Sequence, residues 1–238
     1  EAMKTTGKLT AAKNVKATST DGTMSIGKDV SASNGSIALQ SSGMMQMSGV
    51  LTAGDDVNIT STNGAMTVDG DVTASGSDIT LQSNGTMKTS GALTAGNDVN
   101  ITSTNGTMFI GGDVTTSSGD ITLKSDGNMQ TTGALTADND VSITSTNGTM
   151  SIDGDVSTTT GDITLQSSGT MQTTGELTAA KNVKAIADGA MTVSGAVTAD
   201  DSVNITSTNG TMTIGGDVYA STGDITLQSK EAMQTSGA

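Results

Sequence analysis

"GALTAGNDVNITSTNGTMFIG" at residues 91–111 and "GDVTTSSGDITLKSDGNMQTT" at residues 112–132 together make the 42-residue period that decides the fold. Apolar and polar residues alternate within both stretches at a period of two and never at 3.6, which indicates short strands. The alternating pairs of the first stretch are Leu93 and Ala95, Val99 and Ile101, and Met108 and Ile110. Gly, Asn, Asp and Ser separate the pairs and mark corners. Each stretch is therefore expected to hold three strands, with two inward residues in each strand.

The rest of the chain repeats these two units, which we call type A and type B. Residues 1–6 precede eleven units: 7–27, 28–48, 49–69, 70–90, 91–111, 112–132, 133–153, 154–174, 175–194, 195–215 and 216–236. Ten units have 21 residues and one has 20, and the ninth and tenth units are both type A. Repetition at such a period is typical of stacked arrays. We therefore expect residues 1–238 to form one repeat segment of a longer array.

Three strands in each unit, without long connections, predict a right-handed parallel β-helix. In this triangular solenoid each unit is one coil, and each strand pairs with its equivalent in the next coil. Eleven coils at a strand spacing of about 4.8 Å would make a rod roughly 50 Å long. An antiparallel sandwich would need hairpins at strand spacings of about eight to twelve residues, and a disordered tract would lack the fixed apolar positions.

The phrase "ITSTNGTM" at residues 101–108 has near-copies at 59–66, 143–150 and 205–212. Asn-Gly between two strands ordinarily predicts a hairpin. Within the repeat, however, it falls between two faces of one coil, so we expect a corner there, with Ile101 the last inward residue before it. Asn105 and Gly106 are expected at this corner because both tolerate the left-handed backbone region.

A methionine recurs at the same position of every unit. The members of this column are Met24, Met45, Met66, Met87, Met108, Met129, Met150, Met171, Met191, Met212 and Met233. Methionine fills irregular gaps in a narrow core, whereas stacked thioethers could also bind a soft metal such as Cu(I). The neighbouring positions are apolar or Thr, and the chain has no His or Cys, so the column is predicted to be core.

An aspartate lies beside the second strand in most units. The calcium candidates are Asp56, Asp78, Asp98, Asp120, Asp140 and Asp162, and Asp224 holds the same position near the C-terminus. Stacked carboxylates would repel one another, and two interpretations remain open. Calcium would be bound by carboxylate and carbonyl oxygens, or each Asp would accept hydrogen bonds from backbone N–H groups at the turn. The turn is favoured, because the glycine-aspartate nonapeptide of calcium-binding rolls is missing. No other cofactor is indicated.

The formal net charge of −14 excludes nucleic acid and anionic membranes as expected partners. No apolar run approaches the length of a membrane span, which argues against membrane insertion. Basic spots occur where "TAAKNVKA" is written twice, with Lys13 and Lys16 in one copy and Lys181 and Lys184 in the other. These lysines could dock an acidic glycan, or they could neutralise the aspartate column, which is the interpretation we favour.

The sequence predicts no enzyme. Without His or Cys, neither a Ser-His-Asp nor a Cys-His arrangement can form, and no pair of acids stands apart at a defined separation as glycoside hydrolysis requires. A carbohydrate-active β-helix enzyme remains an alternative, as does an ice- or calcium-binding solenoid. The outward second-strand positions mix Asn100, Thr102, Thr122 and Lys124, which argues against a regular ice-binding face.

"GALTAGNDVNITSTNG" and "GDVTTSSGDITLKSDG" resemble the repeats of filamentous-haemagglutinin-like exoproteins, which are bacterial adhesins exported by two-partner secretion, and of related autotransporter passengers. The resemblance covers practically the whole chain. It implies a β-helix shaft that is secreted or held at the cell surface, at the outer membrane of a Gram-negative bacterium. The implied partners are adjoining repeats and a surface receptor or glycan of host or bacterium.

Two departures from that family matter. Its secretion domain is not recognisable here, and the coils are more alike than usual, which suits a purely structural shaft or a polymerising filament. The chain starts with "EAMKTTG" and stops after "KEAMQTSGA", at the same phase of the repeat. Exposed strand edges invite further pairing, so we expect either a segment of a longer array or a unit that self-associates end to end.

Overall fold

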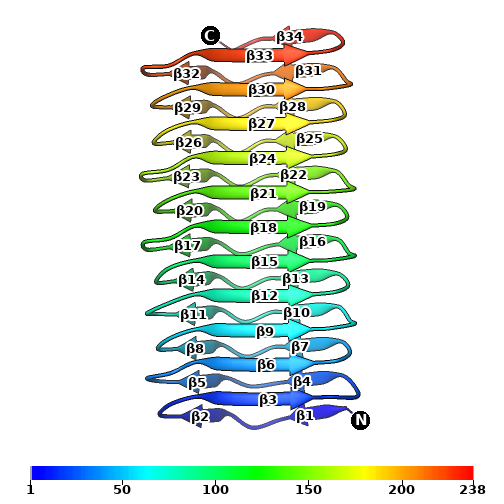
Figure 1. Cartoon of the computed structure of the whole chain (residues 1–238), viewed down its shortest axis with the longest axis vertical. Coiled ribbons are helices and arrows are strands. Elements are labelled where there is room, and N and C mark those ends of the chain that lie inside the picture. Colours follow the sequence, from blue (N-terminus) through cyan, green and yellow to red (C-terminus); the bar gives the residue numbers. More distant parts are fainter. Residues whose placement is uncertain (1, 238) are drawn as a thin grey trace.

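The computed structural model describes residues 2–237 as 34 short strands and no helix. The strands form three parallel sheets, in which every strand pairs with the strand three places away along the chain. The result is a rod of stacked coils with the two termini at opposite ends (Figure 1). The long strands in front run left to right as the chain climbs and the fainter ones behind run back, so the winding is right-handed. The expected right-handed parallel β-helix is confirmed.

We name the three sheets after their most regular residues. The methionine sheet contains β1 (Met3–Thr5), β4 (Met24–Ile26), β7 (Met45–Met47), β10 (Met66–Val68), β13 (Met87–Thr89), β16 (Met108–Ile110), β19 (Met129–Thr131), β22 (Met150–Ile152), β25 (Met171–Thr173), β28 (Met191–Val193), β31 (Met212–Ile214) and β34 (Met233–Thr235). The threonine sheet contains β2 (Leu9–Ala11), β5 (Val30–Ala32), β8 (Leu51–Ala53), β11 (Val72–Ala74), β14 (Leu93–Ala95), β17 (Val114–Thr116), β20 (Leu135–Ala137), β23 (Val156–Thr158), β26 (Leu177–Ala179), β29 (Val197–Ala199) and β32 (Val218–Ala220). The long sheet contains β3 (Val15–Ser19), β6 (Ile37–Ser41), β9 (Val57–Ser61), β12 (Ile79–Ser83), β15 (Val99–Ser103), β18 (Ile121–Ser125), β21 (Val141–Ser145), β24 (Ile163–Ser167), β27 (Val183–Ala187), β30 (Val203–Ser207) and β33 (Ile225–Ser229).

Two corners of the coil change length between the unit types. The corner from the threonine sheet to the long sheet, here the Asp corner, has three residues in type A (96–98) and four in type B (117–120). The corner from the long sheet to the methionine sheet, here the Asn-Gly corner, has four in type A (104–107) and three in type B (126–128). The ninth unit takes the short form at both corners, and this is why it has 20 residues.

The expectation of two inward residues in every strand is wrong for the long sheet. Its strands have five residues, and the third inward position is usually a buried serine. Ser103 Oγ donates to Gly85 O at 2.8 Å, and Ser125 Oγ donates to Gly106 O at 2.8 Å. A buried hydroxyl is tolerated here because it is hydrogen-bonded. Ile101 is therefore not the last inward residue before the Asn-Gly corner.

The glycines of the corners are required by close stacking and not by backbone dihedrals. No residue of the described part of the chain has φ in the left-handed region, so the reason expected for Asn105 and Gly106 is wrong. A Cβ on Gly106 would lie 2.5 Å from the carbonyl carbon of Gly85, and one on Gly112 would lie 2.3 Å from Gly91 O. Backbone thus stacks directly on backbone where a side chain has no room.

The core runs the whole length of the rod as one cluster of Val, Ile, Leu, Met and Ala side chains. A buried polar group without a hydrogen-bond partner recurs at the second inward position of the methionine sheet in type B coils. The hydroxyls of Thr89, Thr131 and Thr173 are fully buried and have no hydrogen-bond partner among the described residues. Leaving a buried donor unsatisfied costs about 1–3 kcal/mol, so these positions are local weak points of the core.

Candidate functional site

The aspartates predicted beside the second strand form a continuous hydrogen-bonded column at the Asp corner. Each side chain accepts a hydrogen bond from the backbone N–H of the equivalent residue one coil later. For example, Asp98 N donates to Asp78 Oδ1 at 3.0 Å, and Asp120 N donates to Asp98 Oδ1 at 2.9 Å. Asp56, Asp140 and Asp162 are bonded in the same way. The carboxylates therefore act between coils, as acceptors for the N–H groups of the corner residues just before the long strands.

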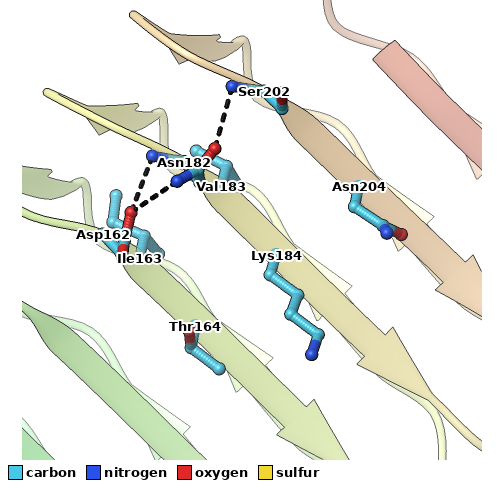
Figure 2. Close-up of a pocket in the computed structure, with 8 residues that line it drawn as sticks. All are labelled: Asp162, Ile163, Thr164, Asn182, Val183, Lys184, Ser202 and Asn204. Atoms are coloured by element: carbon cyan, nitrogen blue, oxygen red, sulfur yellow. Dashed lines mark hydrogen bonds between the residues drawn. The ribbon is translucent and has the colours of Figure 1, made fainter. Parts of the chain in front are cut away.

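Neutral residues continue this column at both ends. Figure 2 shows Asp162 Oδ1 accepting from Asn182 N at 2.9 Å and Asn182 Nδ2 at 3.0 Å, while Asn182 Oδ1 accepts from Ser202 N at 3.0 Å. Ser202 Oγ then accepts from Asp224 N at 3.2 Å. The position therefore needs a short side chain with an acceptor oxygen, and a negative charge is optional.

The calcium prediction for this column remains a prediction. Within residues 2–237 no group of three or more His, Cys, Asp or Glu side chains is placed to hold a metal ion. Where the column is acidic, one carboxylate oxygen of each residue bonds to the next coil, and Asp78 Oδ1 also accepts from Asn97 Nδ2 at 2.8 Å. These carboxylate oxygens are therefore already engaged by N–H groups of the protein.

A second acidic column, which sequence reasoning missed, lies at the corner from the methionine sheet to the threonine sheet. Asp71 Oδ1 accepts from Ala92 N at 2.9 Å, and Asp113 Oδ1 accepts from Ala134 N at 2.9 Å. The sequence pattern that could have revealed this column is an aspartate directly before the first apolar residue of each type B unit. Most type A coils carry no acid there, so most successive carboxylates are two coils apart, about 10 Å, which is near the screening length in physiological salt. The exception is Glu176 of the ninth coil, which follows Asp155 by one coil and donates its backbone N–H to Asp155 Oδ1 at 2.9 Å.

The four lysines of the predicted basic spots do not form one patch. Lys16 lies on β3 and Lys184 on β27, eight strands away in the long sheet, with Lys13 and Lys181 in the corners just before them. None of the four forms an ion pair with a described acid. The ion pair that does form joins Lys8 Nζ to Asp29 Oδ2 at 2.7 Å, so neutralisation of the aspartate column by direct pairing is not seen.

Two contacts lower the pKa of the Asp29 carboxyl below its ordinary value. The larger is the hydrogen bond from Lys8, and the second is the backbone N–H of Val50, at 3.2 Å from Asp29 Oδ1. The same pair raises the pKa of Lys8. Both side chains are solvent-exposed, so this pair is a surface feature of the first coils.

The outer face around Lys184 is slightly hollowed. The hollow, of about 340 Å³, lies along the first residues of β24, β27 and β30. Thr164, Lys184 and Asn204 stand side by side on its floor (Figure 2). The hollow is lined by one ammonium, on Lys184, and one carboxylate, on Asp162, among neutral amide and hydroxyl groups, so it offers no converging acid pair.

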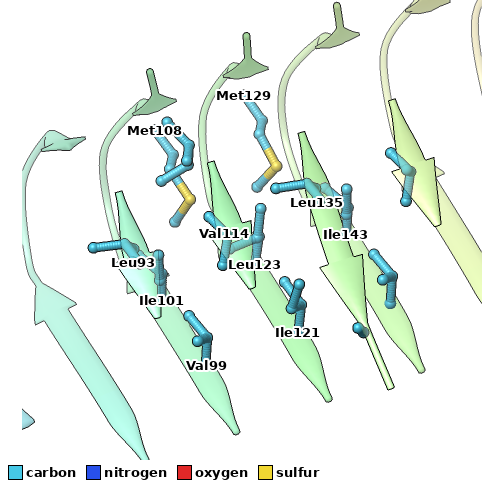
Figure 3. Close-up of a cluster of buried hydrophobic side chains, with 14 of the residues drawn as sticks. Leu93, Val99, Ile101, Met108, Val114, Ile121, Leu123, Met129, Leu135 and Ile143 are labelled. Atoms are coloured by element: carbon cyan, nitrogen blue, oxygen red, sulfur yellow. The ribbon is translucent and has the colours of Figure 1, made fainter. Parts of the chain in front are cut away.

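The methionine column lies inside the rod. Met24 to Met212 are at most 2% exposed, and Figure 3 shows Met108 and Met129 pointing into the same interior as Leu93 and Leu123. Met233 differs, since 40% of it is exposed. Its strand, β34, pairs with β31 on one side and with no described strand on the other.

A single row of hydroxyls runs along the outside of the threonine sheet, one for each strand. Its members are Thr10, Ser31, Thr52, Thr73, Thr94, Thr115, Thr136, Ser157, Thr178 and Thr198, and Tyr219 ends it. Sequence reasoning had tested only the long-sheet positions for such regularity. The three-residue strands expose one side chain each, so the row is one residue wide.

The described residues contain no helix that is long and apolar enough to cross a membrane. Comparison with family models, with curated proteins and with solved structures found no match to this chain.

Proposed function

We propose that this chain is a stiff structural shaft, with a mechanical and spacing role and no catalytic one. The observation that carries the proposal is that the regular features of the chain are arranged in columns along the axis. Core methionines, corner glycines and aspartates all repeat from coil to coil. A binding or catalytic site would instead require side chains that differ from coil to coil and converge at one place.

Three sets of interactions resist bending of such a shaft. The backbone hydrogen bonds of the three sheets run parallel to the axis, as in other solenoids. The aspartate column at the Asp corner ties each coil to the next from outside, and the serine hydroxyls of the long sheet tie the coils from inside. Bending the rod would stretch those of the bonds that lie on its convex side.

The finer proposal is that the shaft belongs to a secreted bacterial surface adhesin or extracellular fibre. It is supported by the resemblance of the repeats to filamentous-haemagglutinin-like exoproteins and by the net charge of −14. A strongly acidic rod is repelled by anionic cell surfaces, which would keep it extended away from them. Receptor or glycan binding would then reside in other modules that the shaft displays.

We also propose that the chain can associate end to end. The first strands β1, β2 and β3 and the last strands β34, β32 and β33 each pair on one side only among the described residues. Unpaired strand edges are templates for further pairing, and the two ends present equivalent edges of the same three sheets. Electron microscopy of the purified chain would show filaments that lengthen with concentration, whereas uniform short rods at every concentration would contradict this association.

The shaft proposal is tested by a distance measurement. Cysteines introduced at Ser31 and Thr198 lie on the outer face of β5 and β29, eight strands apart in the threonine sheet, and about 38 Å apart at 4.8 Å per strand. Spin labels there should give a narrow distance distribution by pulsed electron resonance. A broad distribution would show a flexible chain and overturn the proposal.

A matched variant sharpens this measurement. Deleting residues 91–132 removes one type A and one type B coil, so the labelled distance should fall by about 10 Å and stay narrow. Localisation is a separate test, because antibody accessibility on intact producing cells decides the surface assignment. A protein found only inside the cells would refute the adhesin proposal and leave the shaft proposal standing.

A further inference from the structure

We propose that Asn63, Asn105, Asn147 and Asn209 are sites of spontaneous deamidation, each through a succinimide formed with the glycine that follows it. All four are exposed and occupy the same position in the Asn-Gly corner of a type A coil. The proposal goes beyond the shaft function, because it concerns chemical modification of the finished rod.

The structure leaves the nucleophile of this reaction free in type A coils. At the corner of residues 104–107, Thr104 N donates to Ser83 O at 2.9 Å and Asn105 N donates to Asn84 O at 2.8 Å. The next carbonyl of the coil below, Gly85 O, accepts from Ser103 Oγ at 2.8 Å. Gly106 N, the additional donor of the four-residue corner, has no acceptor among the described residues.

The other three corners repeat this arrangement. Asn63 N, Asn147 N and Asn209 N all donate to the coil below, while the serine hydroxyl of the same coil bonds to the glycine carbonyl there, at 2.7–2.9 Å. The backbone nitrogens of Gly64, Gly148 and Gly210 are likewise left without a described acceptor. An N–H without a partner is not held in place by the sheet.

The chain contains a matched comparison at Asn84-Gly85. This dipeptide is identical but lies in a type B coil, whose Asn-Gly corner has three residues. Here Gly85 N donates to Gly64 O at 3.0 Å. The Gly85 nitrogen would have to break this hydrogen bond before it could attack. We therefore expect the Asn-Gly dipeptide to react more slowly in a type B coil than in a type A coil.

The reaction balances without any co-reactant other than water. The Gly106 nitrogen loses its proton and attacks the side-chain carbonyl carbon of Asn105, forming a C–N bond. The bond from that carbon to the amide nitrogen breaks, and ammonia leaves with the proton. Water then opens the five-membered imide at either carbonyl, giving aspartate or isoaspartate.

Modification would weaken the corner in two ways. Asn147 Nδ2 donates to Asp126 Oδ1 at 2.6 Å, and a carboxylate in its place would face another carboxylate. Isoaspartate also adds one atom to the backbone, at a corner where even a Cβ on Gly148 would lie 2.5 Å from the carbonyl carbon of Gly127. Each event adds one negative charge to a chain already at −14.

The experiment compares sites within one folded molecule. The chain is incubated in mildly alkaline buffer, and deamidation at these four sites and at Asn84 is followed by peptide mapping with mass spectrometry and by isoaspartate methylation. Asn63, Asn105, Asn147 and Asn209 should react faster than Asn84 by roughly fivefold or more, the factor that one net backbone hydrogen bond is worth. In denaturant the five rates should converge. An Asn84 that reacts as fast as the others in the folded rod would overturn the proposal, and so would a difference that persists after unfolding.

A single-residue deletion supplies the control variant. Removing Thr104 gives the corner the three-residue form of type B, and the short corners of the ninth coil show that the solenoid accepts a 20-residue unit. With the fold verified by circular dichroism, Asn105 should slow to the rate of Asn84 while Asn63 is unchanged. An unaltered rate at Asn105 in the folded deletion variant would contradict the mechanism.

Discussion

Replacing Thr131 with Val should stabilise the rod. The Thr131 side chain is fully buried, its hydroxyl has no partner among the described residues, and its column neighbours on either side are Ile110 and Ile152. Val has the same branched shape and strand preference, so no cavity or overpacking follows. Removing an unsatisfied buried hydroxyl is worth about 1–3 kcal/mol. We therefore expect the free energy of unfolding to increase by about 1–2 kcal/mol.

The matched control for this prediction is Thr116→Val. Thr116 is also buried, but its hydroxyl donates to Gly119 O at 2.7 Å. Its replacement leaves that carbonyl without this donor and should cost about 1 kcal/mol. Urea denaturation should therefore move the midpoint of Thr131→Val upward and that of Thr116→Val downward at unchanged slope.

The stabilising effect should also add along the rod. Thr89, Thr131 and Thr173 are two coils apart in the methionine sheet, about 10 Å, and share no partners, so their effects should sum in the triple Val variant. If Thr131→Val destabilises the rod as much as Thr116→Val does, its hydroxyl is satisfied in solution and the reasoning is refuted.

Three further predictions concern the core, a corner and the surface ion pair. Met108→Asp places a charge in a fully apolar column and should cost several kcal/mol, measured as loss of the β signal in circular dichroism; an unchanged signal and rod would mean that the register is wrong. Gly112→Ala puts a Cβ 2.3 Å from Gly91 O and should destabilise by about 2 kcal/mol or more, measured by urea denaturation, whereas Gly7→Ala meets nothing within 4 Å and serves as the neutral control. The lowered pKa of Asp29 means that its contribution to stability is complete above the ordinary pKa of 3.8 and is lost as the pH falls through the lower folded value; an NMR titration should show this pKa rising in Lys8→Met, and no rise would exclude Lys8 as the main cause.

The alternation of apolar residues was enough to predict the fold because each sheet has one buried and one exposed face. Leu93, Val99 and Met108 mark the three faces, and their recurrence in every unit sets the pairing partners. The buried serines were missed because only apolar side chains were counted as inward. Ser103 is inward through its position in the strand, and its polarity is satisfied by a carbonyl that only the stacked coil supplies.

The role of the glycines was misjudged for a related reason. Asn-Gly has positive φ in hairpins because the chain must reverse there, and at residues 105–106 it does not reverse. What excludes a side chain from Gly106 is the neighbouring coil, which local sequence rules do not describe. The hydrogen bonds of Asp78 and Asp98 also cross between coils, so the turn role could be predicted from residue type but the bonded partner could not.

The ninth coil, with both corners in their short form, has the effect of a stacking fault in a layered crystal. Layers on both sides remain coherent, but the A/B order on one side is shifted by one layer relative to the other. A molecule that binds surface features repeated every two coils would be out of register with those features beyond residues 175–194. Adding or removing one such coil in the sequence would change the length of the rod by about 5 Å. The length can therefore be adjusted in steps finer than the 42-residue repeat suggests.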